Sequence, residues 1–266
     1  MRKHPVFGLS APEKGWVPAP RYLLRRSRFL KLVTPLPRGS ILEIGCGAGA
    51  LLSDLSQLGF TCCALETSPA AFALATYVNQ GSSSVKIYQQ ARNDWRGTFD
   101  IVVALEVLEH IEDDHAALVQ WSSWLKPQGC IIISVPAHPR RWNASDVWAG
   151  HFRRYERFAL QEKLEQVGFR VRHLECYGYP LANIIDPIRA YHHKRLAHQH
   201  QQRATLARQR SENTARSGVE RSLENKLYPL QASWIGTKMM QMFFFLEEMF
   251  ANTDLGNGYL ALAQRQ

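Results

Sequence analysis

The chain has 266 residues, of which 45% are hydrophobic and 21% charged, a composition typical of a globular protein and unlike that of a disordered or fibrous one. Its longest dense apolar run, residues 239–246, is far shorter than the ~20 residues that span a bilayer, and the N-terminus lacks the apolar core of a signal peptide, so we expect a cytoplasmic location. Five cysteines without a C-x-x-C pair argue against a disulfide framework or a zinc site.

Positive charge is concentrated in two segments. Residues 1–38 carry nine Lys or Arg against one acid, residues 187–226 carry nine against three, and residues 39–186 carry 12 against 16. Basic flanks of this kind suit an anionic partner such as a phosphorylated substrate, a membrane surface or nucleic acid. A solvated basic surface without a partner is the alternative.

Strand-like and helix-like segments alternate through most of the chain. After a proline-rich extended arm at 1–20, apolar spacing predicts a basic amphipathic helix over 21–36, ended by two prolines. Apolar strands are expected at 40–44, 61–65, 85–88, 100–104, 130–135, 169–176 and 258–263. Helices are expected at 50–58, 68–79, 113–125, 157–167 and 234–250. This alternation predicts an α/β fold whose mostly parallel sheet is covered on both faces and binds ligands at the carboxyl ends of its strands.

A glycine-rich turn follows the first of these strands. Residues 45–49 read GCGAG, and glycine is needed where the backbone bends sharply or touches a ligand. Glu66 ends the next strand, where a carboxylate can bind both hydroxyls of a ribose. The turn also fits the loose G-x-G-x-x-A fingerprint of dinucleotide sites, so a nicotinamide cofactor is an alternative. The G-x-G-x-G spacing and Glu43, inside the strand, favour S-adenosylmethionine (SAM).

Several motifs resemble those of one enzyme family. Residues 41–49 (ILEIGCGAG) resemble motif I of class I SAM-dependent methyltransferases, and residues 99–111 (FDIVVALEVLEHI) resemble their fourth-strand motif. Residues 125–134 resemble the L-K-P-G-G segment, with Gln128 at the first glycine position. Residues 150–155 (GHFRRY) and 253–259 (TDLGNGY) resemble a bacterial subgroup with G-H-Y-R-R-Y, similar to ubiquinone-pathway O-methyltransferases. The resemblance implies a Rossmann-like doubly wound sheet of seven strands.

The resemblance also implies a set of SAM contacts. By position in the motifs, the cofactor residues are Glu43, Gly45, Cys46, Gly47, Gly49, Glu66, Leu105 and Glu106. The family often places an acid after the third strand to hold the adenine amino group, but residues 89–94 here read QQARND. Gln90 or Asp94 could accept that hydrogen bond; of the two, we include Gln90 in the predicted site.

Two segments supply candidates for the acceptor site, which has to align the acceptor and remove a proton. His110 follows the fourth strand, in the E-x-x-E-H stretch that lies near the active site of similar enzymes, although it could instead brace a loop. The same resemblance offers Glu106, Glu109 and His110 as metal ligands, but we assign no metal. The block 142–155 supplies His151 and Tyr155 as further catalytic candidates and Trp148, Arg153 and Arg154 as acceptor-binding residues. A structural lid, with its arginines paired to acids, is the alternative for this block.

We divide the chain into an arm and basic helix (1–38), a SAM-binding domain (39–186), a basic helical insertion or lid (187–230) and a closing helix and strand (231–266). The insertion is expected to include a loop around 211–218. Either basic segment could close over the site or dock on anionic lipid, whereas the apolar helix 234–250 is expected in the core.

These observations favour methylation of a small acceptor, anionic or lipid-linked, with oxygen as the atom suggested by family analogy. An RNA methyltransferase would use the basic flanks, but no RNA-binding module is recognisable. A methyltransferase fold kept as a non-catalytic binding protein is the third hypothesis.

Overall fold

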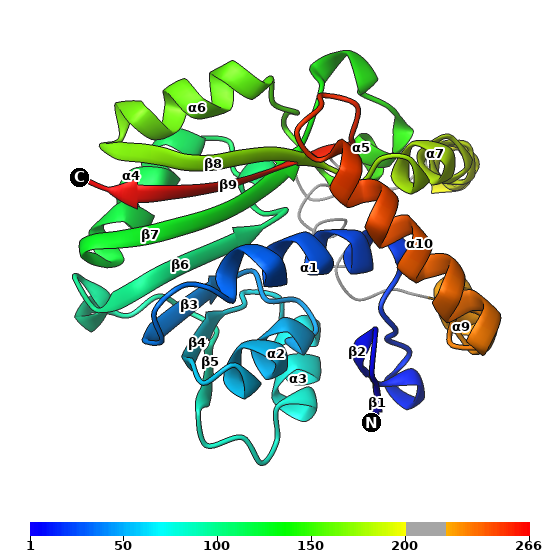
Figure 1. Ribbon diagram of the computed structural model, residues 1–266, viewed down its shortest axis with the longest axis horizontal. Coiled ribbons are helices and arrows are strands. Elements are labelled where there is room, and N and C mark those ends of the chain that lie inside the picture. Colours follow the sequence, from blue (N-terminus) through cyan, green and yellow to red (C-terminus); the bar gives the residue numbers. More distant parts are fainter. Residues whose placement is uncertain (201–221) are drawn as a thin grey trace.

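The computed structural model describes residues 1–200 and 222–266, which build a twisted seven-stranded sheet with helices on both faces (Figure 1). The strand order is β5-β4-β3-β6-β7-β9-β8, with β9 antiparallel to both neighbours and the other pairs parallel. The strands are β3 (Ser40–Ile44), β4 (Thr61–Leu65), β5 (Val85–Tyr88), β6 (Phe99–Leu105), β7 (Leu125–Pro136), β8 (Phe169–Tyr177) and β9 (Gly258–Arg265). The predicted α/β fold is therefore confirmed.

The helices also follow the predicted order. The described ones are α1 (Pro20–Val33), α2 (Ala50–Gln57), α3 (Pro69–Val78), α4 (Asp114–Trp124), α5 (Ala144–Ala149), α6 (Arg157–Gln166), α7 (Leu181–His200), α9 (Ser222–Gln231) and α10 (Trp234–Phe250). Side-chain caps begin several of them: Ser68 accepts from Ala71 N at α3, and Asp113 accepts from Ala116 N at α4.

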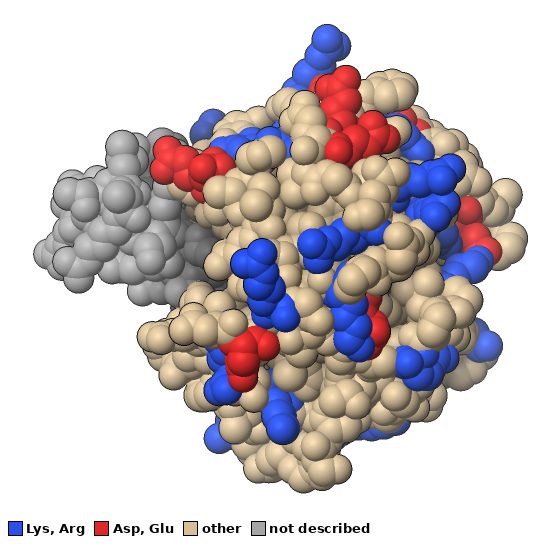
Figure 2. All heavy atoms as spheres, turned by 90° about the vertical axis from the view of Figure 1, so that its left-hand side faces the viewer, with Lys and Arg blue, Asp and Glu red and all other residues tan. Residues whose placement is uncertain are grey.

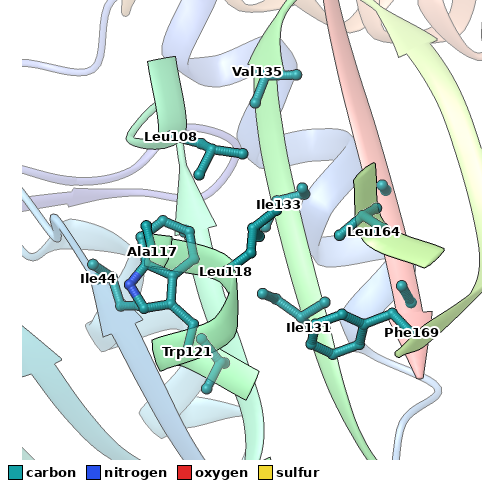
Figure 3. Close-up of a cluster of buried hydrophobic side chains, with 14 of the residues drawn as sticks. Ile44, Leu108, Ala117, Leu118, Trp121, Ile131, Ile133, Val135, Leu164 and Phe169 are labelled. Carbon is teal, nitrogen blue, oxygen red and sulfur yellow. The ribbon is translucent and has the colours of Figure 1, made fainter. Parts of the chain in front are cut away.

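Alternating side chains of the central strands divide the core between the two faces of the sheet. Ile131 and Ile133 of β7 pack with Leu118 and Trp121 of α4 and with Leu164 of α6, as Figure 3 shows. Ile132, between them, joins the opposite cluster, which α1 and α2 cover. This period of two follows from the pleat, and apolar residues at every position explain why the strands are buried on both faces.

Three segments differ from the sequence-based expectation. The arm at 1–20 is not simply extended, because β1 (Arg2–His4) and β2 (Gly8–Ser10) pair as a short antiparallel ribbon. Helix α7 runs through Pro187, so the insertion begins near residue 181 rather than at 187. Helix α5 was not predicted at all. The predicted loop at 211–218 lies outside the described residues.

The prediction that the apolar helix at 234–250 belongs to the core is wrong. Along α10 the buried residues are Met240 and Glu247, and Phe243 and Phe244 are partly buried. Apolar residues surround this helix on all sides, so packing one side on the protein leaves the other side facing solvent. No helix within residues 1–200 and 222–266 is long and apolar enough to cross a membrane.

Glu247 is a buried acidic residue of α10, and its burial predicts a pH dependence of stability. Its Oε1 accepts from Gly178 N at 2.7 Å, whereas Oε2 is buried with no hydrogen-bond partner. Burial raises the pKa of Glu247 to about 8. Between pH 4.5 and 8 the unfolded chain ionises this group while the folded protein keeps its proton, so folding is penalised increasingly as the pH rises.

We expect Glu247→Gln to remove this penalty. The variant keeps an oxygen for Gly178 N, and urea unfolding should show it more stable than the wild type by ~4 kcal/mol near pH 8, with the difference disappearing below pH 4.5. A difference independent of pH would mean that Glu247 does not titrate in this range.

Candidate active site

The glycine turn between β3 and α2 requires glycine at defined positions. Gly45, Gly47 and Gly49 have φ angles of 66°, 55° and 69°, in the left-handed region. A Cβ atom on Gly45 would lie 2.7 Å from Val107 Cγ2, and one on Gly49 would lie 2.7 Å from Asn79 Nδ2. Backbone conformation and close packing therefore both select glycine here.

Glu66, at the end of β4, holds this turn in place. Its Oε2 accepts from Gly47 N at 2.8 Å and its Oε1 accepts from Ser68 N at 2.9 Å. Burial raises the pKa of Glu66. Glu66, which the sequence predicts to bind ribose, thus also braces the glycine turn. A carboxylate has enough lone pairs to accept hydrogen bonds from the turn and from ribose hydroxyls.

A cavity of about 430 Å³ opens beside the turn, at the carboxyl ends of β3 and β6. The predicted residues that line it are Glu43, Gly45, Cys46, Gly47, Leu105, Glu106, His110, Trp148, His151 and Arg154. Its volume lies within the range of ~300–1,000 Å³ that is typical of small-molecule sites. The topology therefore brings together residues that are more than a hundred positions apart in the sequence.

Glu43 lies in the wall of this cavity, and one of its carboxylate oxygens lacks a hydrogen-bond donor in the described part of the chain. It is 4% exposed, and its Oε2 has no hydrogen-bond partner among residues 1–200 and 222–266. Burial raises the pKa of Glu43 to about 8, although Arg25 opposes the shift. A buried acceptor without a donor is costly, and a cationic group in the cavity would relieve that cost. The residues present therefore fit the ammonium end of SAM.

Glu106, at the end of β6, is an ionised carboxylate of the cavity. Its Oε1 accepts from Tyr177 Oη at 2.7 Å, and its Oε2 accepts from Arg21 Nη2 at 3.2 Å. Burial would raise its pKa, but the guanidinium groups of Arg21 and Arg25 lower the pKa of Glu106 to about 2. The N-terminal helix α1 is therefore a wall of the site as well as a cover of the sheet.

Two histidine rings, those of His110 and His151, meet edge to face on another wall, with centroids 4.7 Å apart. His151 Nδ1 lies 3.0 Å from Asp146 Oδ1. Burial opposes ionisation of Asp146, but His151 and Arg154 lower its pKa to about 2. Burial, with the neighbouring His151, lowers the pKa of His110 to about 3. A histidine held by an ionised carboxylate has the geometry of a general base with an orienting partner.

Glu109 lies behind the two rings and completes a group of three potential metal ligands. One ligand atom from each of Glu109, His110 and His151 can be chosen such that all lie within 4.8 Å of one another. Glu109 is fully buried, and in the described part of the chain neither carboxylate oxygen has a hydrogen-bond partner, although Oε1 lies 3.9 Å from His110 Nε2 and 3.8 Å from His151 Nε2. Burial and the charge of Glu106 raise the pKa of Glu109 well above its ordinary value. Imidazole and carboxylate are ligands that transition metals accept.

Several predicted site residues lie elsewhere. Tyr155 Oη donates to Asp114 Oδ2 at 2.9 Å, and Arg153 Nη1 pairs with the same oxygen at 2.8 Å. Neither residue is among the described residues that line the cavity, so the acceptor-binding role of Arg153 and the catalytic role of Tyr155 stay predictions that this geometry does not favour. Gln90 is exposed beyond β5, and neither it nor the predicted cofactor residues Gly49 and Glu66 are among the described residues that line the cavity.

Substitution of the neighbouring Arg153 and Arg154 by alanine is expected to reduce stability by different amounts. Arg153→Ala leaves Asp114 bonded to Lys163 and Tyr155, so we expect a loss of ~1 kcal/mol in stability and an unchanged SAM affinity. Arg154 Nε donates to Asp146 at 2.8 Å and is buried, so Arg154→Ala should cost ~3 kcal/mol. Thermal unfolding and SAM titration of both variants check this; a larger loss for Arg153→Ala would contradict it.

Sequence reasoning missed other residues of the cavity. Arg21 and Arg25 are four residues apart on α1, and this spacing on one helix face was the signal available for them. Helix α7 contributes His193, whose ring stacks on Trp148 with centroids 4.2 Å apart. No local pattern linked His193 to the site, because α7 reaches it through tertiary packing on α5.

Comparison with known proteins agrees with this geometry. A model of the methyltransferase domain family matches residues 19–174, more than half of the chain. The chain therefore belongs to that family, and its glycine turn and sheet are those of class I SAM-dependent methyltransferases.

Individual proteins are similar over shorter stretches. The ubiquinone biosynthesis O-methyltransferases of Bradyrhizobium diazoefficiens and Xanthomonas campestris pv. campestris are 36% and 30% identical over 35% and 37% of this chain. The chain spans 38% and 44% of those two proteins. A SAM-dependent methyltransferase structure from Mesorhizobium loti covers 90% of this chain, and 98% of that chain, with a TM-score of 0.53 and 15% identity, which supports the fold.

Proposed function

We propose that the protein transfers the methyl group of SAM to an oxygen atom of a small acceptor. The observation that carries the proposal is the buried, unpartnered carboxylate of Glu43 beside the glycine turn, because it needs a cation and lies at the ligand edge of the sheet. The O-methyltransferase relatives support oxygen as the target.

The residues of the cavity, together with Glu66 behind the glycine turn, divide into two groups in this proposal. Glu43 would bind the ammonium of SAM, the backbone of the glycine turn would contact its methionine end, and Glu66 its ribose. When bound, SAM supplies a methyl group on a positively charged sulfur. The stacked rings of Trp148 and His193 form a flat wall that suits an aromatic acceptor.

The acceptor needs a base if its hydroxyl is to attack as an oxyanion. We assign that role to His151, because ionised Asp146 would orient its ring and stabilise the imidazolium that forms. His110 is a poorer base, because its low pKa means that its conjugate acid is strong.

A calorimetric titration tests the cofactor part of the proposal. We expect micromolar binding of SAM and S-adenosylhomocysteine, no binding of NADH, and loss of binding in Glu66→Ala, since that variant releases Gly47 N and Ser68 N. Binding of NADH instead would favour an oxidoreductase. Absence of SAM binding would overturn the proposal and favour a non-catalytic binding protein.

RNA methylation is the second candidate function. On the face in Figure 2, Lys and Arg side chains stand apart among neutral and acidic ones and form no continuous track. This face, seen from the left of Figure 1, therefore offers no charged track for an RNA backbone. RNA affinity that falls steeply with salt would nevertheless favour this function over a small acceptor.

A further inference from the structure

Helices α9 and α10 present a continuous row of apolar side chains to solvent. We call it the outer stripe, and its members are between 51% and 76% exposed: Leu227, Leu230, Trp234, Ile235, Met239, Met242, Phe245 and Met249. Their spacing of mostly three and four residues keeps them on one side of the helices. Figure 1 shows α10 and α9 along the edge of the molecule, away from the sheet.

The opposite side of α10 explains how the stripe is held outward. Met240 is buried with Leu23 and Leu24 of α1, and Glu247 is bonded to the backbone at Gly178. The helix is therefore attached to the protein through its opposite side. The exposed side cannot be buried by rotation of α10 without loss of these contacts. A contiguous apolar surface on a monomer marks a site of contact with a partner or a membrane.

Charge around the outer stripe indicates which partner it fits. Lys226 and Lys238 are exposed on the same helices; Lys226 directly precedes Leu227 of the stripe, and Lys238 lies between Ile235 and Met239. Among the described side chains of α9 and α10 the one exposed acid is Glu248, which pairs with Lys31. Apolar side chains flanked by lysines, with a tryptophan among them, are typical of helices that lie in the interface of an anionic bilayer.

The outer stripe also lies close to the cavity. Glu224, in the first turn of α9, lines the cavity and precedes Leu227 of the stripe by three residues. Ile188 of α7 lines the cavity as well and is 66% exposed. A molecule resting on the stripe would therefore hold the mouth of its cavity beside the surface that it rests on.

We propose that the outer stripe seats the protein on an anionic lipid surface, with the cavity opening next to the bilayer. The apolar side chains of the stripe would enter the interface, and Lys226 and Lys238 would contact lipid phosphates. If the proposed methyl transfer also holds, an acceptor with an apolar tail could pass from the bilayer into the cavity without crossing water.

Vesicle co-sedimentation at low salt tests this proposal. The wild type should bind vesicles of equal parts phosphatidylcholine and phosphatidylglycerol and bind pure phosphatidylcholine more weakly. We expect Trp234→Ser/Phe245→Ser to reduce partitioning by roughly tenfold or more, since two large side chains leave the interface. Phe158→Ser is the matched control, because Phe158 is 77% exposed on α6, outside the stripe, and should leave binding unchanged.

A second variant isolates the charge. Lys226→Glu/Lys238→Glu should lose the preference for phosphatidylglycerol and keep its weak binding to phosphatidylcholine. Both double variants change exposed side chains, and unchanged melting temperatures would verify their folding.

Three results would overturn the proposal: no binding of the wild type to anionic vesicles, equal binding of Trp234→Ser/Phe245→Ser, or equal loss in Phe158→Ser. A wild-type dimer that the Trp234→Ser/Phe245→Ser variant converts to monomers, without vesicle binding, would assign the stripe to contact between copies. The vesicle assay contains no SAM, so it is independent of the proposed methyl transfer. A protein that binds vesicles but fails to bind SAM in the calorimetric titration would contradict only the proposed enzymatic function.

Discussion

His151→Ala is expected to lower kcat by a factor of roughly 10² to 10⁴, the usual range for loss of a general base, while the SAM dissociation constant stays the same. The residue lies on the cavity wall and is held by Asp146 at 3.0 Å. Single-turnover transfer from radiolabelled SAM to a phenolic acceptor found by screening would measure the effect.

Two comparisons make this prediction specific to His151. Asp146→Asn should also lower kcat and alter the pH profile, because the imidazolium loses the carboxylate that stabilises it. His110→Ala should cost less, since burial holds the pKa of His110 at about 3. Equal losses in both histidine variants, with activity sensitive to a chelator, would instead assign the two rings and Glu109 to a metal.

Gly49→Ala is expected to destabilise the protein by about 3 kcal/mol. The left-handed conformation costs a residue with a Cβ roughly 1–2 kcal/mol, and crowding in a packed site adds about as much. The new methyl group would lie 2.7 Å from Asn79 Nδ2 and 2.9 Å from Ala75 Cβ, and Asn79 also donates to Gly49 O at 2.9 Å. Urea unfolding would measure the change.

Gly81→Ala separates the cost of backbone strain from the cost of crowding. Gly81 has a φ of 90°, but no atom lies within 4 Å of the position that a Cβ would take, so its substitution should cost only the backbone strain, ~1 kcal/mol. Losses of the same size in both variants would mean that packing around Gly49 contributes little.

Local patterns were sufficient for the sheet and for part of the cavity. Strands such as β6 and β7 have long apolar runs, and the glycine turn between β3 and α2 sits at a fixed place in the alternation. The carboxyl ends of neighbouring parallel strands meet at one edge, so Glu43 and Glu106 could be placed together from the order of the strands and motifs alone.

Adjacent residues in an irregular segment could not be resolved in this way. Arg153 and Arg154 follow one another, yet one pairs with Asp114 outside the cavity and the other with Asp146 inside it. The direction in which each arginine side chain points depends on the path of the chain after α5. This segment is irregular, so no periodic pattern in the sequence predicts that path. The exposure of α10 was missed for a related reason. The apolar composition of a helix predicts that the helix is covered, but it does not identify the surface that covers it.

The position of β9 has a consequence for the order of events during synthesis. β8 has β9 as its neighbour in the sheet and is separated from β7 by it. A nascent chain that has made β3 to β7 can already assemble a five-stranded parallel sheet. β8 must wait until β9 has left the ribosome, because β9 is translated later and is the strand that joins β8 to the rest of the sheet. Until then the edge of β7 and the apolar side of β8 are exposed, and this interval is when the chain most needs protection from aggregation.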